Sequence, residues 1–186
     1  MNVIAISPRY TTEKLALGTL DNMIDVFEDQ MQGWLFDQAN ELKSFPHAGF
    51  GILAIVLSYF EPIGQFLQGK AGKSEQQFLV GLAAVFPTLD TSVPASVCRE
   101  LYNPLRCGMF HRGITKSKVI IQPNAESAIK VEYSKCDGVV RRIIVVPVLL
   151  LEESERHLKR YVADLRDTRN IELRQNFEAW FKIRAA

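Results

Sequence analysis

The sequence has few cysteines, no long apolar run and almost no net charge, and each of these features excludes a class of protein. Cys98, Cys107 and Cys136 form no CxxC pair, and an odd count of three is no disulfide framework, which favours a reducing cytoplasm. The formal net charge of +1 argues against a protein that coats nucleic acid by bulk electrostatics. A local basic patch remains compatible with that charge.

The longest apolar run is too short to predict a membrane span. It extends from Gly49 to Phe60, about a dozen residues, whereas a spanning helix needs about 20. The start, Met1 to Tyr10, also lacks a basic segment followed by an apolar one, so no secretory signal is expected. We therefore expect a cytoplasmic protein that makes no membrane contact and has a buried central helix at residues 49–67.

Motifs for nucleotide, metal and serine chemistry are missing. The segment from Gly69 to Ser74 ends like a phosphate-binding P-loop, but Leu67 occupies the place of its first glycine and a predicted helix precedes it. His47, His111 and His157 are far apart and form no HExxH motif, and no GxSxG is present. We interpret the glycine-rich segment as a turn and expect neither a metal nor a cofactor.

Hydrophobic periodicity predicts a single α+β domain that is mainly helical. The first helix carries an apolar stripe, and its acids face elsewhere; the stripe is Leu17, Leu20, Ile24, Phe27, Met31, Trp34 and Leu35, and the acids are Asp21, Asp25, Glu28 and Asp29. Ser74 and Gln77 predict a capping box. The expected helices cover residues 12–42, 49–67, 74–86, 94–102 and 172–183, with another helix from residue 150, and the expected strands cover 118–122, 128–133 and 139–146.

These elements predict three parts of the single domain. A helical bundle is expected at residues 12–113, an antiparallel three-stranded β meander at 117–147, and C-terminal helices at 150–184. Asp137-Gly138 is a strong hairpin signal between the last two strands.

The segment from Asn103 to Gly113 is the best candidate for a functional motif. Asn103 suits an N-cap, Pro104 the first helical position and Gly113 the residue just past a helix end. The helix between them presents Arg106 and His111. In an ideal helix these two side chains would lie about 140° apart, so they converge only through a bent helix or across a dimer.

An arginine and a histidine together can cleave RNA without a metal. Arg106 can bind phosphate oxygens through its fork of donors, and neutral His111 can accept the proton of a ribose 2′-hydroxyl. Attack of that hydroxyl on the neighbouring phosphate would give a 2′,3′-cyclic phosphate and a free 5′-hydroxyl, with Arg106 stabilising the phosphorane.

The run Arg106-Cys107-Gly108-Met109-Phe110-His111, preceded by Leu101-Tyr102, resembles the R-x(4–6)-H signature of HEPN domains, in the RNGxxH-type variants. HEPN domains are mainly helical, usually dimeric proteins found in toxin–antitoxin, abortive-infection and CRISPR-linked ribonucleases. The resemblance implies a HEPN-like bundle over residues 12–113, a homodimer, and Arg106 and His111 as the catalytic pair, in bacterial stress or defence.

Three further residues are candidates for contact with substrate. Asn103 and Arg112 flank the catalytic pair, and Glu61 could serve as an acidic partner of the motif. The leading hypothesis is a metal-independent endoribonuclease or RNA-binding protein, with RNA as its partner.

Other interpretations of the same residues remain open. Arg106 could pair with Asp25 or Glu28 of the first helix, and His111 could cap its own helix. Cys107 is expected to be a small core residue. In place of an enzyme, the chain could be a non-catalytic dimeric module that binds an antitoxin-like protein, or a nucleotide sensor. The face carrying Leu158, Tyr161 and Leu165 would then supply the dimer surface.

The C-terminal region offers a weaker nucleic-acid signal. Basic residues from Arg156 to Arg169 alternate with acids, which favours a solvated, salt-bridged helix face over an RNA-binding one. Trp180 and Phe181 could stack on bases, but burial in a groove of the protein is the better interpretation.

Overall fold

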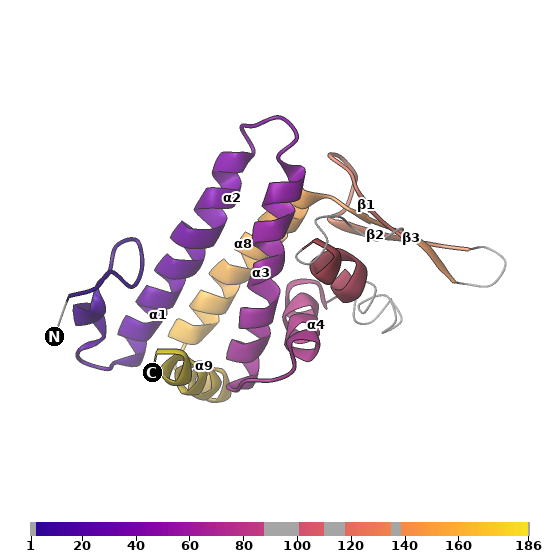
Figure 1. The fold of residues 1–186 in the computed structure, drawn as a ribbon. Helices are drawn as coiled ribbons and strands as arrows, with labels where there is room; N and C mark the ends of the chain where they lie inside the picture. The colour runs from indigo at the N-terminus through magenta and orange to yellow at the C-terminus, as the bar shows by residue number, and fades with distance from the viewer. Residues whose placement is uncertain (1–2, 88–100, 110–117, 135–138, 186) are drawn as a thin grey trace.

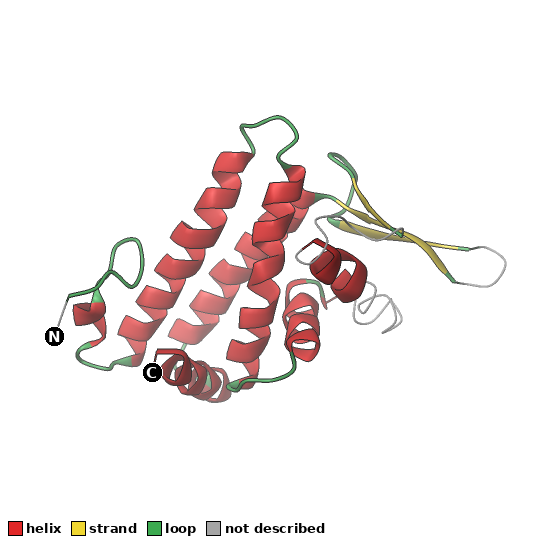
Figure 2. Cartoon of the chain, in the orientation of Figure 1, coloured by secondary structure: helices red, strands yellow, loops and turns green. Residues whose placement is uncertain are grey.

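The computed structural model describes residues 3–87, 101–109, 118–134 and 139–185. Its described part is mainly helical with one small sheet, which confirms the expected α+β class (Figures 1 and 2). In chain order the elements are η1 (Thr12–Leu15), α1 (Leu20–Asp29), η2 (Gln30–Phe36), α2 (Asp37–Leu42), α3 (Gly49–Gln68), α4 (Ser74–Val85), η3 (Leu101–Cys107), β1 (Val119–Ile121), β2 (Ile129–Tyr133), β3 (Val140–Val145), α8 (Pro147–Arg166) and α9 (Ile171–Ala185).

Helix α3 is the centre of the molecule and packs against α2, α4, α8 and α9 (Figure 1). It is long and apolar enough to cross a membrane by length and composition, and half of its apolar window is buried by the other helices. A helix that is apolar on nearly all sides is either buried in a protein core or spans a membrane, and α3 is surrounded by other helices. The prediction of a buried central helix is therefore confirmed.

An aromatic cluster fills the space between α1, α3, α8 and α9. Phe27 lies at its centre, with ring centroids 4.7 Å from Phe66, 5.4 Å from Phe177 and 5.9 Å from Tyr161. All three contacts are edge-on, the geometry that aromatic quadrupoles prefer. Side chains from both ends of the chain thus meet in one core.

The first long helix departs from the predicted apolar stripe at its π-helical segment, η2. Leu17 and Trp34 were expected in the stripe but are 82% and 52% exposed, whereas Phe36 and Ala39 are fully buried. Leu17 precedes the first turn of α1. Trp34 faces outward because the i→i+5 hydrogen bonds of a π-helix place more residues in each turn. The side chains in this segment are therefore rotated from the positions that they would have in an α-helix.

The prediction that Asp29 faces away from the core is also wrong. Asp29 is 4% exposed and accepts hydrogen bonds from the backbone N–H and the side-chain Nε of Arg9, at 2.7 and 2.5 Å. Burial alone would raise the pKa of this carboxyl, but hydrogen bonds from Ser7 and Arg9 outweigh it and lower the pKa. The acid thereby anchors the N-terminal segment to the bundle.

Helices α3 and α4 approach each other closely at two glycines. A Cβ atom at Gly64 would lie 1.9 Å from the carbonyl oxygen of Gln77, and one at Gly81 would lie 1.9 Å from that of Phe60. Such distances leave no room for a side chain. Glycine at both positions is therefore what allows the two backbones to touch.

The predicted capping box at the start of α4 is not formed. Ser74 is already inside the helix, Lys73 is its N-cap, and no side chain caps it. The Ser74 hydroxyl instead donates to Glu61 Oε2 at 2.5 Å, and Gln77 donates to Gln68. A tertiary acceptor therefore takes the hydroxyl that the sequence pattern assigned to the backbone.

The sheet is mixed, and the prediction of an antiparallel meander is wrong. Its strand order is β1-β3-β2, with β1 parallel and β2 antiparallel to β3. After β1, the chain leaves a gap one strand wide before it forms β2. The last strand in the sequence, β3, fills this gap and is therefore the central strand. Ile143, Ile144 and Val145 of β3 are all at least 95% buried, as expected for a strand covered on both faces. The Asp137-Gly138 turn lies outside the described residues.

The C-terminal helices complete the bundle. Leu158, Tyr161 and Leu165 are no more than 3% exposed, so the face proposed as a dimer surface is part of the core, and that prediction is wrong. Trp180 and Phe181 are buried, as expected. Arg156, Arg166 and Arg169 form ion pairs with acids, which confirms a salt-bridged surface on this stretch.

Candidate functional site

Arg106 is positioned by the π-helical segment η3, and the helical structure continues to Met109. Leu101, Leu105 and Met109 are buried and fix the segment to the bundle, while Asn103 is exposed. Asn103 is not an N-cap, because helical turns already include Leu101 and Tyr102. Proline has no N–H to donate within a helix, and wide turns of this kind are frequent at functional sites.

The Arg106 side chain contacts an acid from α3, and this acid also accepts a hydroxyl from α4. Its Nη2 lies 3.1 Å from Glu61 Oε2, and the same oxygen accepts the Ser74 hydroxyl. The guanidinium carbon also lies 5.7 Å from the centre of the Tyr102 ring, within cation–π range. Glu61 of α3 and Tyr102 of η3 thus fix the direction of the guanidinium, and Ser74 of α4 holds Glu61.

This cluster is partly open to solvent. The Arg106 and Glu61 side chains are 27% and 25% exposed. An arginine has five N–H donors in a rigid fork, so a carboxylate on one side is compatible with an anion on another. The arrangement can therefore hold a permanent positive charge in a defined orientation at a surface.

The described residues bring together two of the five predicted site residues and leave two unplaced. Arg106 and Glu61 are in contact, and Asn103 is exposed one helical turn from Arg106. His111 and Arg112 lie outside the described residues. The predicted 94–102 helix and the Gly113 stop also fall outside them, apart from residues 101 and 102.

The alternative partners proposed for Arg106 are not used. Asp25 and Glu28 both bind Arg166 of α8, each at 2.9 Å, and Asp25 also pairs with Lys14. They lie on α1, on the far side of α3 from η3 (Figure 1). Cys107 is half-buried and packs against the core, as expected.

A buried histidine that the sequence did not single out lies inside the bundle. His157 Nδ1 is 2.9 Å from the Tyr59 hydroxyl, and its ring stacks on Tyr161 at 6.0 Å. Burial, together with the charge of Arg160, lowers the pKa of His157 to about 4, so the ring is neutral at pH 7. The four-residue spacing of His157 and Tyr161 on the buried face of α8 was the available signal. The pair belongs to the core rather than to an open site.

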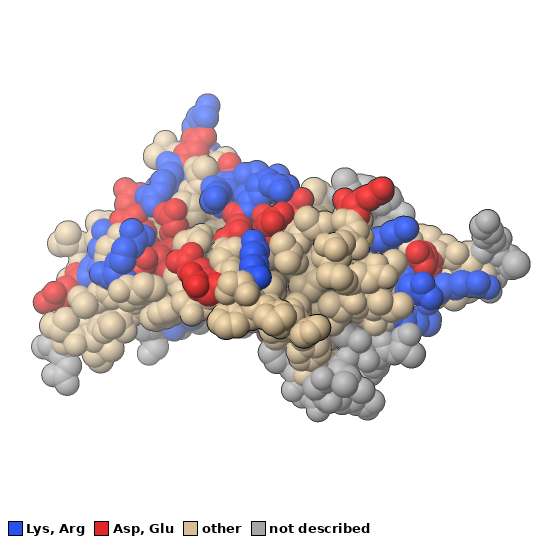
Figure 3. All heavy atoms as spheres, turned by 90° about the horizontal axis from the view of Figure 1, so that it is seen from above, with Lys and Arg blue, Asp and Glu red and all other residues tan. Residues whose placement is uncertain are grey.

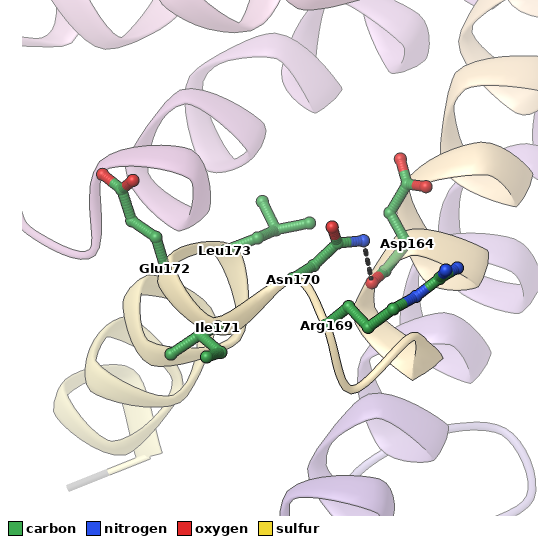
Figure 4. Close-up of a pocket in the computed structure, with 6 residues that line it drawn as sticks. All are labelled: Asp164, Arg169, Asn170, Ile171, Glu172 and Leu173. Atoms are coloured by element: carbon green, nitrogen blue, oxygen red, sulfur yellow. Dashed lines mark hydrogen bonds between the residues drawn. The ribbon is translucent and has the colours of Figure 1, made fainter.

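One pocket lies at the corner between α8 and α9 (Figure 4). It has a volume of about 430 Å³ and is lined by Asp164, Arg169, Asn170, Ile171, Glu172 and Leu173. The Asn170 side-chain amide donates to the Asp164 backbone oxygen at 2.9 Å, which satisfies a carbonyl in the last turn of α8. The geometry is that of a helix corner. The described residues include no group of three or more His, Cys, Asp or Glu that could hold a metal ion.

A more apolar pocket of about 410 Å³ lies where the α2–α3 connection meets β1 and the start of α8. Phe45 and Phe50 form part of its wall and are 63% and 40% exposed. Arg106 does not line this pocket or the one at the α8–α9 corner.

Comparison with known proteins gives no relative. No family model, no curated protein and no solved structure matches the chain.

Proposed function

We propose that the protein is a HEPN-like, metal-independent endoribonuclease or RNA-binding protein that acts as a homodimer in bacterial stress or defence. The observation that carries the proposal is the fixed, partly exposed guanidinium of Arg106, held by Glu61 on a wide helical turn. Support also comes from the resemblance of the Arg106–His111 run to the HEPN signature.

Each residue has a distinct role in this proposal. Arg106 binds the scissile phosphate and stabilises the charge that develops on it. His111 takes the proton of the 2′-hydroxyl and later protonates the 5′-oxygen that leaves. Glu61 is a positioning residue, because it contacts the guanidinium, and Ser74 in turn orients Glu61. Asn103 and Arg112 contact the RNA backbone.

The test is cleavage of a labelled RNA in the presence of a chelator. The wild-type protein should produce 2′,3′-cyclic phosphate ends, and His111→Ala should lose at least about a hundredfold in rate, the typical contribution of a general acid–base group. Arg106→Ala should lose a similar factor, and Glu61→Gln less, because the guanidinium keeps its charge.

A matched control is available in His47, which is exposed in the α2–α3 connection. His47 has a φ of +63°, so asparagine, which tolerates the left-handed conformation, is the suitable replacement. His47→Asn should cleave at the wild-type rate. Equal cleavage by wild type and His111→Ala, or activity that a chelator abolishes, would refute the nuclease proposal.

A second candidate is a non-catalytic interaction module, favoured by the exposure of Phe45 and Phe50 beside the apolar pocket. Large exposed apolar side chains next to a pocket are typical of protein-binding surfaces. We take the partner to be a second copy of the chain. Light scattering should then show a dimer that Phe45→Ser with Phe50→Ser converts to a monomer, without any RNA turnover in either protein.

A further inference from the structure

The sheet extends beyond the bundle as a two-stranded ribbon. Strand β1 pairs with β3 only at residues 143–145, so the part of β3 that precedes Ile143 has β2 as its sole described neighbour. Figure 1 shows β2 and β3 projecting away from the helices. An isolated two-stranded ribbon is only marginally stable, and buried Val140 attaches this one to the core.

A β-bulge in the ribbon places two consecutive arginines at the surface. Glu132 pairs with Arg142 and Tyr133 with Val140, so Arg141 is the extra residue with no partner on β2. Successive side chains of a regular strand point to opposite faces, yet Arg141 and Arg142 are both exposed. A bulge bends a strand and redirects a side chain, and such features are frequent beside functional sites.

The ribbon is basic. Its described residues carry three cations, Lys130, Arg141 and Arg142, against one acid, Glu132. Glu132 lies 3.7 Å from both Lys130 Nζ and Arg142 Nη1, so one carboxylate is shared between two cations. Arg141 forms no ion pair with any residue that the structure describes. In Figure 3, Lys and Arg side chains gather at the right of the view, where the strands project.

An exposed aromatic ring accompanies these charges. Tyr133, at the end of β2, is 39% exposed and pairs with Val140 one step from the bulge. Cations that contact phosphates, together with an open aromatic face on which a base can stack, form the usual surface for a single-stranded nucleic acid.

We infer that the β2–β3 ribbon is an RNA-binding arm, in which Arg141 and Arg142 contact phosphates of a single strand and Tyr133 stacks on a base. Strand β1 packs beside η3 and pairs with the last residues of β3, so the base of the arm is connected through β1 to the segment that carries Arg106. The inference rests on the proposed function for its choice of RNA. It concerns binding alone and requires no cleavage.

The experiment is fluorescence anisotropy with a short labelled single-stranded RNA, measured over a range of salt concentrations in the His111→Ala background so that the probe stays intact. Arg141→Gln with Arg142→Gln should bind about tenfold more weakly at low salt. For this variant, the slope of log K plotted against the logarithm of the salt concentration should be shallower by about 1.4, which is about 0.7 for each lost phosphate contact. Tyr133→Ala should weaken binding with little change in that slope, because stacking releases no counterions.

Two control variants separate local contacts from bulk charge and from misfolding. Arg169→Gln with Lys182→Gln also removes two positive charges, from exposed positions on the C-terminal side of the bundle, and should bind as wild type. Arg141→Lys with Arg142→Lys keeps the charges and should retain most of the affinity. Thermal unfolding checks that each variant is folded.

The arm is refuted if the Arg141 and Arg142 double variant binds as tightly as its parent, if the Arg169 and Lys182 control weakens binding equally, or if the parent does not bind RNA. It is also refuted if the double variant changes only the oligomeric state, because the ribbon would then be a protein contact. Failure of the nuclease proposal is separate. It would appear as RNA binding that depends on the ribbon without any cleavage by the protein that retains His111.

Discussion

The helical bundle and the β2–β3 ribbon use their side chains in opposite ways. The bundle closes Phe27, Phe66, Phe177 and the His157–Tyr59 pair away from water. The ribbon leaves Arg141 and Arg142 in solvent at an irregularity of its ladder. Burial of apolar surface is the main source of folding free energy, whereas exposed charges add little to it. Stability is therefore expected to reside in the bundle and recognition in the ribbon.

The sharpest test of this division is Phe27→Ala. Phe27 is fully buried and contacts three aromatic rings, so its truncation should lower the free energy of unfolding by about 3–5 kcal/mol. Urea unfolding measures the loss, with Leu17→Ala, at an exposed position, as the control. A loss below about 1 kcal/mol would show that the aromatic cluster is not the stabilising core.

The buried His157 should make stability depend on pH. The pKa of His157 is about 4 in the folded chain, whereas a histidine in an unfolded chain has a pKa near 6.5. The unfolded chain therefore binds the proton more readily. The contribution of neutral His157 is complete above pH 6.5 and is lost as the pH falls toward 4. It is on the order of 3 kcal/mol, at 1.36 kcal/mol per pKa unit.

This pH dependence is measured as the free energy of unfolding of wild type and His157→Gln between pH 7 and pH 4, with the folded-state pKa of His157, about 4, as the lower limit. The substitution should flatten the curve in that range, while His47→Asn should leave it unchanged. Parallel curves for wild type and His157→Gln would mean that the imidazole accepts a proton in the folded protein without loss of stability.

A smaller effect is expected from the ion pairs between α8 and α1. Arg166 binds Asp25 and Glu28 but is 43% exposed, so Arg166→Gln should cost only about 0.5–1 kcal/mol. High salt should reduce that cost. Arg169→Gln, which removes a local pair with Asp167 at an 88% exposed side chain, should cost less still. Equal losses would show that the link between the helices adds nothing.

The smallest effect on stability is predicted for the ribbon. Arg141→Gln with Arg142→Gln should change the free energy of unfolding by less than about 0.5 kcal/mol, although the same variant should bind RNA more weakly. Thermal unfolding provides the measurement. A loss of about 2 kcal/mol or more would make the ribbon part of the folding unit and remove the contrast with the bundle.

The helices were predictable where local signals agree. Gly49–Gln68 and Ser74–Val85 follow from apolar runs bounded by turn residues, and the buried face of α8 follows from its period. The π-helical turn at Gln30–Phe36 could not be predicted, because no composition signal marks it and it changes the helical phase. The parallel pairing of β1 with β3 depends on a long-range choice of neighbour that strand patterns do not encode.

The candidate site shows the same limit. The sequence indicated Arg106 through a motif and suggested Glu61 as an acidic partner, and the two are in contact. The sequence pattern predicts a cap at Ser74, because its tertiary acceptor on α3 cannot be identified from neighbouring residues. The exposure of Arg141 and Arg142 was missed for a related reason, since a bulge depends on the register of a partner strand.

The close contact of α3 with α4 has a consequence for efforts to stabilise the chain. Replacing a helical glycine with alanine is a common stabilising strategy, but the Phe60 carbonyl oxygen would obstruct a methyl group at Gly81. Phe60 immediately precedes Glu61, so separating the helices would also move the carboxylate that orients Arg106. A side chain at Gly81 would thus disturb the Glu61–Arg106 contact as well as the packing of α3 against α4.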